Sequence, residues 1–570
     1  ELVDGMPEII PYGVTATTMK EMGQTAKAWM QVLDKDSRLP KFKVRASMED
    51  SAEVTEVTGM NFAMGKGVDE NLIPVIVDKT ILFEYDHSLR KAYGLAKNSL
   101  EDLLDQTQID CNDVPCCFFA DKKTVKKNED FSIQEIYGMS EDWDAYENLK
   151  EMFLTENWFE NKQRESKELA FNITERIKTE TGNPVFDAYC RQNYLDNLLR
   201  GGYPVKIGEN QVFYLYSRKH GDMERDYNFF SMLPEYYSQG NGNFRDVNQN
   251  RRCDVQFSPF VGKSVIKTFY NALQINGYNP LVIDKIVYRL DEEYEKVLAG
   301  NSEEPEEIKE ILHGEFTPGS LYRSLEKCGI TNVDEIFEKI MNLAKRIDRT
   351  VYGEGHWSDH WTYNLDLVES YLSVYPEKEK ELLYEDASYM YTQAEKQIFP
   401  RKRRYVCTEK GIRQYAFLKD NVDTSKEENR YLKDQKGQIV RTNLMTKLFT
   451  LLSNKISALD PYGMGIEMEG GKPGWYDALN GLPGLLGSSM AEAYETLRMA
   501  LFMRKVVEKI RADISLPEEL EVLQQKLLAA CNQLEKTSGE GQETEFWNSI
   551  NDAKEMFWEA TACSISGNWI

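Results

Sequence analysis

The sequence has few histidines and no regular cysteine pattern. Its 570 residues include five His and nine Cys, with neither an HExxH nor a CxxC motif. Cys116 and Cys117 are adjacent, and the other cysteines stand singly. Zinc sites and disulfide frameworks need ligands or partners at regular spacings, so both are disfavoured. We therefore expect no metal and predict a cytoplasmic location.

Long apolar runs and an excess of positive charge are also missing. No run is long enough to span a bilayer, and no signal-peptide pattern is recognisable. The net charge of −25 repels phosphate backbones and anionic lipids, so neither nucleic acid nor a membrane is expected as a partner. A neutral, polar substrate is compatible with this charge. The chain starts at Glu1 and stops after "SISGNWI", which leads us to expect a segment of a longer protein.

The order of apolar residues predicts strands first and helices afterwards. Short β-rich runs such as "LIPVIVDKTILFEYD" are typical of antiparallel strands, so residues 1–90 are interpreted as the C-terminal part of a β-sandwich domain. Residues 91–180 are interpreted as a helical linker and lead-in, and 181–570 as a helical domain. Apolar residues three and four positions apart predict the following helices: 88–106, 146–180, 183–202, 263–276, 280–298, 319–327, 333–347, 362–374, 377–397, 440–455, 488–512 and 516–535.

Long, polar connections join these predicted helices. A bundle would need shorter connections, so the pattern favours a helical barrel or toroid with its function in the loops at one end. The acidic stretch 301–310 is interpreted as a solvated loop and helix start, and 536–545 as a surface linker.

The first candidate loop is "YYSQGNGNFRDVNQNRRCDV", residues 236–255. It contains Arg245 beside Asp246, and Arg251 beside Arg252. A guanidinium next to a carboxylate can bind hydroxyls and anions together. The alternative is an Arg–Asp pair that only ties a loop to a helix.

The second candidate loop is "GEGHWSDHWTYNLD", residues 353–366. Trp357, His360 and Trp361 suggest a sugar site, because aromatic faces stack on pyranose rings while polar neighbours bind hydroxyls. His356 and His360 with Asp359 would be a weak metal site, since a third recognisable ligand motif is missing. The alternative is a capped helix N-terminus with the Trp residues in the core.

The third candidate loop is "GGKPGWYDALNG", residues 470–481. Cleavage of a glycosidic bond needs an acid for the leaving oxygen, and apolar surroundings raise the pKa of a carboxyl group enough to supply one. Trp475 and Tyr476 could provide those surroundings for Asp477. The alternative is an Asx-turn or a helix N-cap at Asp477.

Two of these loops carry a family resemblance. "PGWYDALNG" resembles the G-D-W-N-D-G-M-N loop of the inverting cellobiose phosphorylase family, and "GNFRDVNQ" resembles its G-F-R-D-S-N-Q motif, in the same order along the chain. "LVDGMPEIIPYG", residues 2–13, looks like the segment before the family's catalytic domain. "NPVFDAYCRQNYLDNLLRGG", residues 183–202, looks like its N-P-Y-Q helix.

The resemblance implies a fold and a set of roles. The fold is mainly α, an (α/α)6 barrel preceded by a β-sandwich and a helical linker. Asp477 matches the general acid, and Trp475 matches the Trp that lines the subsite of the cleaved sugar. Arg245 matches the Arg that contacts phosphate and sugar, and Asp246 the carboxylate that binds sugar hydroxyls. Gln249 matches the last residue of the G-F-R-D-S-N-Q motif and is included as a substrate contact.

The chain also departs from the family pattern. Pro473 and Gly474 stand where the first Asp of the acid motif would be, and Tyr476 replaces its Asn. Arginines that the family has just before G-F-R-D are missing, with Arg218 and Arg225 as substitutes. The family's F-K-E-N-G-G motif and phosphate-binding His do not follow the acid loop, which again favours a segment of a longer chain.

The expected function is inverting phosphorolysis of β-linked gluco-oligosaccharides to α-glucose-1-phosphate. Inorganic phosphate is the co-substrate, no cofactor is expected, and a homodimer is a candidate assembly because family members are often dimers. One alternative is an inverting β-glucan hydrolase, with Glu467, Glu469 or Glu354 as its base. The other is a non-catalytic carbohydrate-binding relative.

Overall fold

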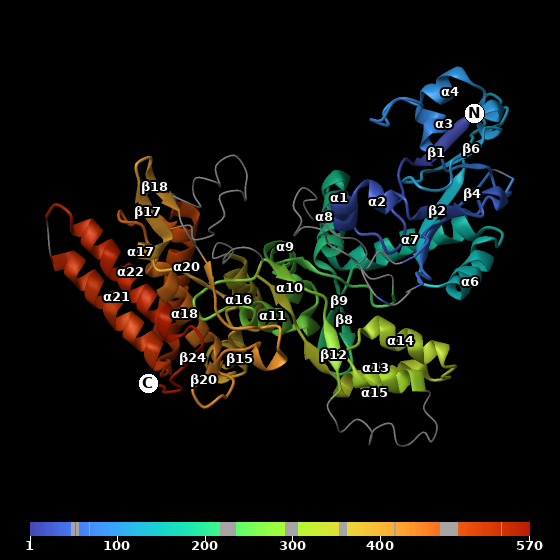
Figure 1. Ribbon diagram of the computed structural model, residues 1–570. Helices are drawn as coiled ribbons and strands as arrows, with labels where there is room; N and C mark the ends of the chain where they lie inside the picture. Colours follow the sequence, from blue (N-terminus) through green and yellow to red (C-terminus); the bar gives the residue numbers. More distant parts are fainter. Residues whose placement is uncertain are drawn as a thin grey trace. The chain divides into compact units, whose positions relative to one another are not determined.

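The computed structural model describes residues 1–46, 52, 56–67, 69–216, 235–290, 306–352, 362–414, 418–467, 488–536 and 539–570. Of the described residues, 47% are helical and 19% lie in strands, so the predicted mainly-α class is confirmed (Figure 1). The chain forms two compact units, Glu1–Glu175 and Arg176–Ile570.

The first unit contains two small antiparallel sheets, with strand orders β2-β3-β4-β7 and β1-β6-β5. The strands are β1 (Leu2–Met6), β2 (Met30–Leu33), β3 (Lys41–Val44), β4 (Met60–Lys66), β5 (Val75–Ile76), β6 (Cys117–Asp121) and β7 (Gln134–Ser140). The helices are α1 (Ala16–Met22), α2 (Gln24–Lys27), α3 (Lys79–Phe83), α4 (Tyr93–Lys97), α5 (Leu100–Leu104), α6 (Trp143–Phe153) and α7 (Trp158–Thr174).

Strand β4 packs on both of its faces. Because side chains alternate along a strand, Phe62 lies on one face and Ala63 on the other. Phe62 packs against Tyr146 of α6 in one apolar cluster, whereas Ala63 shares a second cluster with Phe119 of β6 in the other sheet. A Cβ atom on Gly65 would lie 2.5 Å from the Phe119 ring, so glycine permits this close packing of the two sheets.

The predicted boundary at residue 90 is wrong. β6 pairs with β1 and β7 pairs with β4, so strands from both sides of residue 90 form the same sheets. These strands come from "CCFFAD" and "IQEIYGMS", which are short runs without a helical spacing of apolar residues. The predicted helix 88–106 is instead the two short helices α4 and α5.

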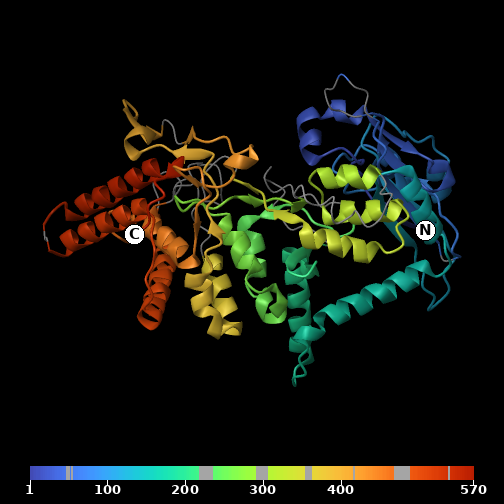
Figure 2. The ribbon, with the colours of Figure 1, turned by 90° about the horizontal axis from the view of Figure 1, so that it is seen from below.

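The second unit is dominated by helices. They are α8 (Pro184–Gly201), α9 (Phe244–Arg251), α10 (Asp254–Phe257), α11 (Ser264–Asn271), α13 (Glu306–His313), α14 (Pro318–Lys327), α15 (Val333–Leu343), α16 (Thr362–Val374), α17 (Arg401–Arg404), α18 (Leu444–Ile456), α20 (Met490–Ile510), α21 (Glu518–Lys536) and α22 (Gln542–Ala560). Figures 1 and 2 both show α21 and α22 as neighbours.

Short strands connect these helices. They are β8 (Tyr203–Ile207), β9 (Gln211–Leu215), β10 (Gly242–Asn243), β11 (Val282–Ile283), β12 (Val287–Arg289), β13 (Lys345–Ile347), β14 (Thr350–Val351), β15 (Tyr389–Met390), β16 (Lys396–Ile398), β17 (Tyr405–Thr408), β18 (Gly411–Gln414), β19 (Leu418–Asp420), β20 (Lys433–Asp434), β21 (Arg441–Thr442), β22 (Ile466–Glu467), β23 (Ser488–Ser489) and β24 (Ser564–Ile565).

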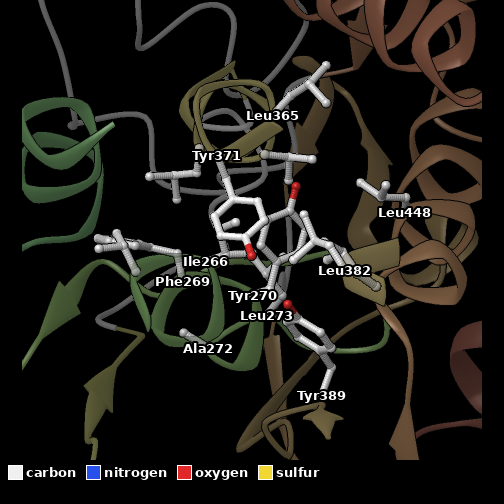
Figure 3. Packing of buried hydrophobic residues seen from close by; sticks show 14 of the residues in the cluster. Ile266, Phe269, Tyr270, Ala272, Leu273, Leu365, Tyr371, Leu382, Tyr389 and Leu448 are labelled. Carbon is white, nitrogen blue, oxygen red and sulfur yellow. The ribbon is translucent and has the colours of Figure 1, made fainter. Parts of the chain in front are cut away.

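The largest apolar core of this unit lies between α11, α16 and α18. Phe269 of α11, Leu365 and Tyr371 of α16, and Leu448 of α18 are among its buried residues (Figure 3). Tyr270 is also buried there, and its hydroxyl donates to the carbonyl oxygen of Asn364 at 3.1 Å. The apolar residues whose spacing predicted these three helices are therefore the residues that are buried between them.

Three other predictions for this unit are wrong. Part of 280–298 forms β11 and β12, because its β-branched run favours strands over a helix. Within 377–397, a single π-helical turn (Glu381–Glu385) is followed by β15 and the start of β16. Residues 542–545, expected in a surface linker, begin α22, whose apolar side packs in a core with α21.

An ion-pair cluster fixes the N-terminal end of α11. Asp386 Oδ2 lies 2.6 Å from Lys263 Nζ and 3.3 Å from Lys267 Nζ. Burial alone would raise the pKa of Asp386, but the hydrogen bonds from Lys263 and Ser388 and the charge of Lys267 outweigh it. They lower this pKa from 3.8 to about 2.

Asp386 should therefore stabilise the fold most above its unfolded pKa. This contribution, about 2 kcal/mol, is present above about pH 4 and is lost as the pH falls through about 2. Asp386→Asn should remove this pH-dependent contribution. Urea denaturation between pH 2 and pH 6 would measure the free energy of unfolding of both proteins. Asp420→Asn is the control, because the Asp420 side chain pairs with Lys396 but is 90% exposed. Equal pH profiles for Asp386→Asn and the wild type would contradict the assignment.

Candidate functional site

Helices α9 and α16 run side by side in the same direction. Asn248 Nδ2, in the middle of α9, donates at 2.6 Å to Asn364 Oδ1, near the start of α16. Further along, Arg252 lies 3.4 Å from Asp366. Past the end of α9, Gln256 Nε2 of α10 donates to the hydroxyl of Ser373 at 3.3 Å. The contacts advance together along both segments, so α9 and α16 begin at the same end of the unit.

Helix α20 runs in that direction too. Arg498 Nη2 donates to Asp366 Oδ1 at 2.7 Å and also contacts Glu369, one turn further along α16. Beyond the end of α16, Glu379 pairs with Lys509 near the end of α20. The N-terminal ends of α9, α16 and α20 therefore lie at one end of the second unit.

The predicted Arg245–Asp246 pair lies at the first turn of α9. Asn243 caps this helix, and its Oδ1 accepts from the backbone N–H groups of Arg245 at 3.0 Å and Asp246 at 3.4 Å. Arg245 Nε donates to Asp246 Oδ1 at 2.9 Å, with 42% and 25% of the two side chains exposed. Gln249 is exposed one turn after Arg245, on the same face. A donor and an acceptor side by side suit a ligand with hydroxyl or anionic groups.

A small sheet holds this turn in place. β10 pairs with β11, and β11 pairs with β14, so Gly242 and Asn243 are anchored before the helix starts. Phe244, the first residue of α9, is fully buried against Phe269, with ring centroids 5.1 Å apart. The position of Arg245 is therefore set by the backbone on one side and by the core on the other.

Most of the predicted site residues lie outside the described residues. Trp475, Tyr476 and Asp477 belong to the segment 468–487. Trp357, His360 and Trp361 belong to the segment 353–361.

The described residues on either side show where these segments attach. β22 pairs with β23, so residues 467 and 488 are held together, and Ser489 caps α20 through a hydrogen bond from the N–H of Glu492. The segment 353–361 follows Tyr352 and ends at the start of α16. Each segment is thus joined to one of the three helix starts.

A buried ion pair connects α18 to α20 beside the attachment of 468–487. Lys455 Nζ donates to Glu492 Oε2 at 2.7 Å, and the two side chains are only 3% and 10% exposed. Lys455 lies in the last turn of α18 and Glu492 in the first turn of α20. The pair therefore fixes the last turn of α18 against the start of α20.

Glu467, a candidate base, is held by other contacts. Its Oε1 accepts a hydrogen bond from Trp547 Nε1 of α22 and lies 3.7 Å from Arg401. The Arg401 guanidinium stacks over the Trp547 ring at 3.5 Å from its centroid. Glu354 and Glu469, the other two candidates, lie outside the described residues.

The Arg251 side chain is held by contacts within the fold. It is buried, donates to the carbonyl oxygen of Gly201 at 2.8 Å and to the Tyr216 hydroxyl at 2.7 Å, and stacks over the Tyr214 ring at 3.6 Å. Burial raises the pKa of nearby Asp254 to about 7, although the Arg251 charge opposes this shift. Arg218 and Arg225, the proposed substitutes for the arginines that the family has before its G-F-R-D motif, both lie outside the described residues.

The second unit also contains a polar cavity that no sequence motif indicated. It lies near the end of α11, and its lining includes Asp284, Arg346 and Asp348. Its walls come from segments between residues 268 and 431, which share no motif, so no local pattern could have indicated it.

Within the described ranges, no group of three His, Cys, Asp or Glu side chains is arranged to hold a metal ion. None of the helices that the structure describes has the length and apolarity needed to cross a bilayer. The chain matches no protein-family model, and no curated protein matches it.

Proposed function

We propose that the chain catalyses inverting phosphorolysis of β-linked gluco-oligosaccharides, giving α-glucose-1-phosphate. The main support is the common direction of α9, α16 and α20. Arg245 and Asp246 lie on the first of these helix starts, and the segments carrying the other two sequence candidates attach at the second and third. An active site built from loops requires candidates that are distant in the sequence to meet at one end of a helical unit, and the attachment points of these segments are compatible with this arrangement.

In this mechanism Asp477 is the general acid. Its carboxyl proton passes to the bridging oxygen as the bond from that oxygen to the anomeric carbon breaks. A phosphate oxygen forms a new bond to that carbon from the opposite face, so the configuration inverts. The products are α-glucose-1-phosphate and an oligosaccharide shorter by one glucose, and Asp477 regains its proton from solvent.

Arg245 is proposed to offset the phosphate charge, while Asp246 binds hydroxyl groups of the sugar. Charge-assisted hydrogen bonds to an anion are roughly twice as strong as neutral ones, and a guanidinium can offer two in parallel. The Nε–Oδ1 bond between the two residues keeps this donor and acceptor in fixed relation. Trp475, Tyr476, Trp357, His360 and Trp361 are proposed as further sugar contacts.

An (α/α)6 barrel is proposed as the scaffold, supported by alternating helix directions. α11 is antiparallel to α16, because Tyr270 bonds to Asn364 at one end and Tyr375 bonds to Pro259 at the other. α18 is antiparallel to α20, because its last turn carries Lys455 beside Glu492, whereas its first turn bonds to the carbonyl of Ser515, beyond the end of α20.

The hydrolase alternative has less support. An inverting hydrolase needs a free carboxylate base, typically 6.5–9.5 Å from the acid. Glu467 already accepts from Trp547 and lies beside Arg401, so it is poorly suited to activate water. Phosphorolysis needs no such base, since phosphate is itself the nucleophile.

The proposal is tested by phosphate dependence. The chain is incubated with α-glucose-1-phosphate and a panel of β-linked glucose acceptors, and phosphate release is measured. In the opposite direction, oligosaccharide breakdown should require phosphate. Breakdown at full rate without phosphate would refute phosphorolysis and favour the hydrolase, and no turnover in either direction would favour a non-catalytic relative.

In the same assay, Arg245→Ala should lower kcat/KM for phosphate about 10- to 100-fold, the loss expected for a hydrogen bond to a charged group. Arg252→Ala is the matched control, because it removes the same charge from the other end of α9, where Arg252 pairs with Asp366. If the two substitutions had equal effects, Arg245 would act on phosphate only through the net electrostatic potential of the protein and not through a direct contact.

A further inference from the structure

The polar cavity has a volume of about 380 Å³. This is within the range of about 300–1,000 Å³ that is usual for small-molecule sites. Asn271, at the end of α11, and Thr350, on β14, lie on its walls, together with Met390 and Tyr431. All of these residues belong to the second unit. Because α11 is antiparallel to α16, the cavity lies toward the same end of the unit as the start of α16.

The charges on the cavity walls balance in number: three arginines, Arg346, Arg349 and Arg430, and three carboxylates, Asp284, Asp348 and Glu395, line it. Arg346 Nη2 donates to Asp348 Oδ1 at 2.7 Å, and its Nε lies 3.0 and 3.2 Å from the two carboxylate oxygens. Arg349 Nη2 donates to both carboxylate oxygens of Glu315, at 2.6 and 2.5 Å. An anionic ligand would therefore find no excess of positive charge here, because lining arginines and lining carboxylates are equal in number.

Hydrogen-bond acceptors face the cavity as well. Asp284 accepts at Oδ1 from the N–H of Lys285, at 2.8 Å. Within the described ranges its Oδ2 has no partner, and neither has the carboxylate of Glu395. Hydroxyl groups of Thr424 and Tyr431, and the amide of Asn271, complete a mixed set of donors and acceptors. Such a set matches a ligand with many hydroxyl groups and no charge.

We propose that this cavity, whose lining includes none of Arg245, Asp246 and Gln249, binds an uncharged carbohydrate of one or two sugar rings. The hydroxyls of the sugar would donate to Asp284 and Glu395. Glucose is chosen as the sugar because of the proposed function, and this choice alone rests on it. The site itself follows from the shape and charge balance of the cavity.

Met390 provides a local probe, since it lines the cavity. The full chain would be labelled with ¹³C-methyl methionine, and the Met390 signal assigned by its loss in Met390→Leu. Glucose and a β-linked glucose disaccharide should shift this signal in a saturable manner. Met503, buried in the main core, is the internal control. Inorganic phosphate should leave the Met390 signal unchanged.

Two variants test the contacts. Asp284→Ala and Glu395→Ala should each weaken binding at Met390 about tenfold or more, as expected for a lost hydrogen bond to a carboxylate. Glu409→Ala, at an exposed carboxylate in the β17–β18 turn, is the control. An absent Met390 shift, a shift with phosphate, or wild-type affinity in both variants would overturn the proposal.

The two proposals fail separately. Asp477→Asn should retain the Met390 shift, because it changes the other site. A chain that shows this shift but releases no phosphate from α-glucose-1-phosphate would contradict phosphorolysis and support the cavity site. A chain that releases phosphate without any Met390 shift would overturn the cavity site alone.

Discussion

Asp477→Asn is expected to slow phosphorolysis of β-linked gluco-oligosaccharides about 10²–10⁴-fold, the usual contribution of a general acid. An amide cannot deliver the proton that the bridging oxygen needs as its bond breaks. The loss should be much smaller for an aryl glucoside whose leaving group departs without a proton. Phosphate-dependent release of glucose-1-phosphate from both substrates measures this difference.

The control for this substitution is Asp513→Asn, the same chemical change at an exposed position after α20. It should retain wild-type rates, and Asp477→Asn should retain wild-type affinity for the oligosaccharide. An equal loss on both substrates would indicate a structural role for Asp477, and an unchanged rate would remove it from the mechanism.

Lys455→Met is expected to lower the free energy of unfolding by about 3–5 kcal/mol, the usual cost of breaking a buried ion pair from one side. The substitution removes the ammonium group that donates to the Glu492 carboxylate, a side chain only 10% exposed. Urea denaturation, followed by far-UV circular dichroism, measures the change. Activity should fall as well, because α18 and α20 meet at the attachment of 468–487.

A second substitution separates charge from packing. Lys455→Met combined with Glu492→Leu should recover most of the stability, since apolar replacement of a whole buried pair is often neutral or better. Lys509→Met, at a 64% exposed lysine of α20 that pairs with Glu379 beyond the end of α16, should cost about 0–1 kcal/mol. A double variant no more stable than Lys455→Met would contradict this explanation.

Local signals predicted much of the helical unit. The helix predicted at 183–202 is α8, and the structure places Pro184 in its first turn, after the N-cap Asn183. The helix predicted at 362–374 is α16 with the same bounds. Such features depend on neighbouring residues, so they can be recognised in a single sequence.

Other features depend on contacts between distant residues. β11 has two residues and exists because β10 and β14 lie on either side of it. The cavity joins residues 268 to 431, and only packing brings its charges into balance. For the candidate site, Arg245 and Asp246 could be found because they are adjacent, whereas the parallel course of α9, α16 and α20 follows from buried partners such as Asn248 and Asn364.

The pairing of β22 with β23 has an evolutionary consequence. Because residues 467 and 488 are already joined, the chain between them can change length with little effect on the fold. Doubling the length of a flexible segment whose two ends are joined costs only about 0.6 kcal/mol in chain entropy. Insertions and deletions there would leave the helices unchanged, so evolution could alter the proposed site through this segment without altering the fold around it.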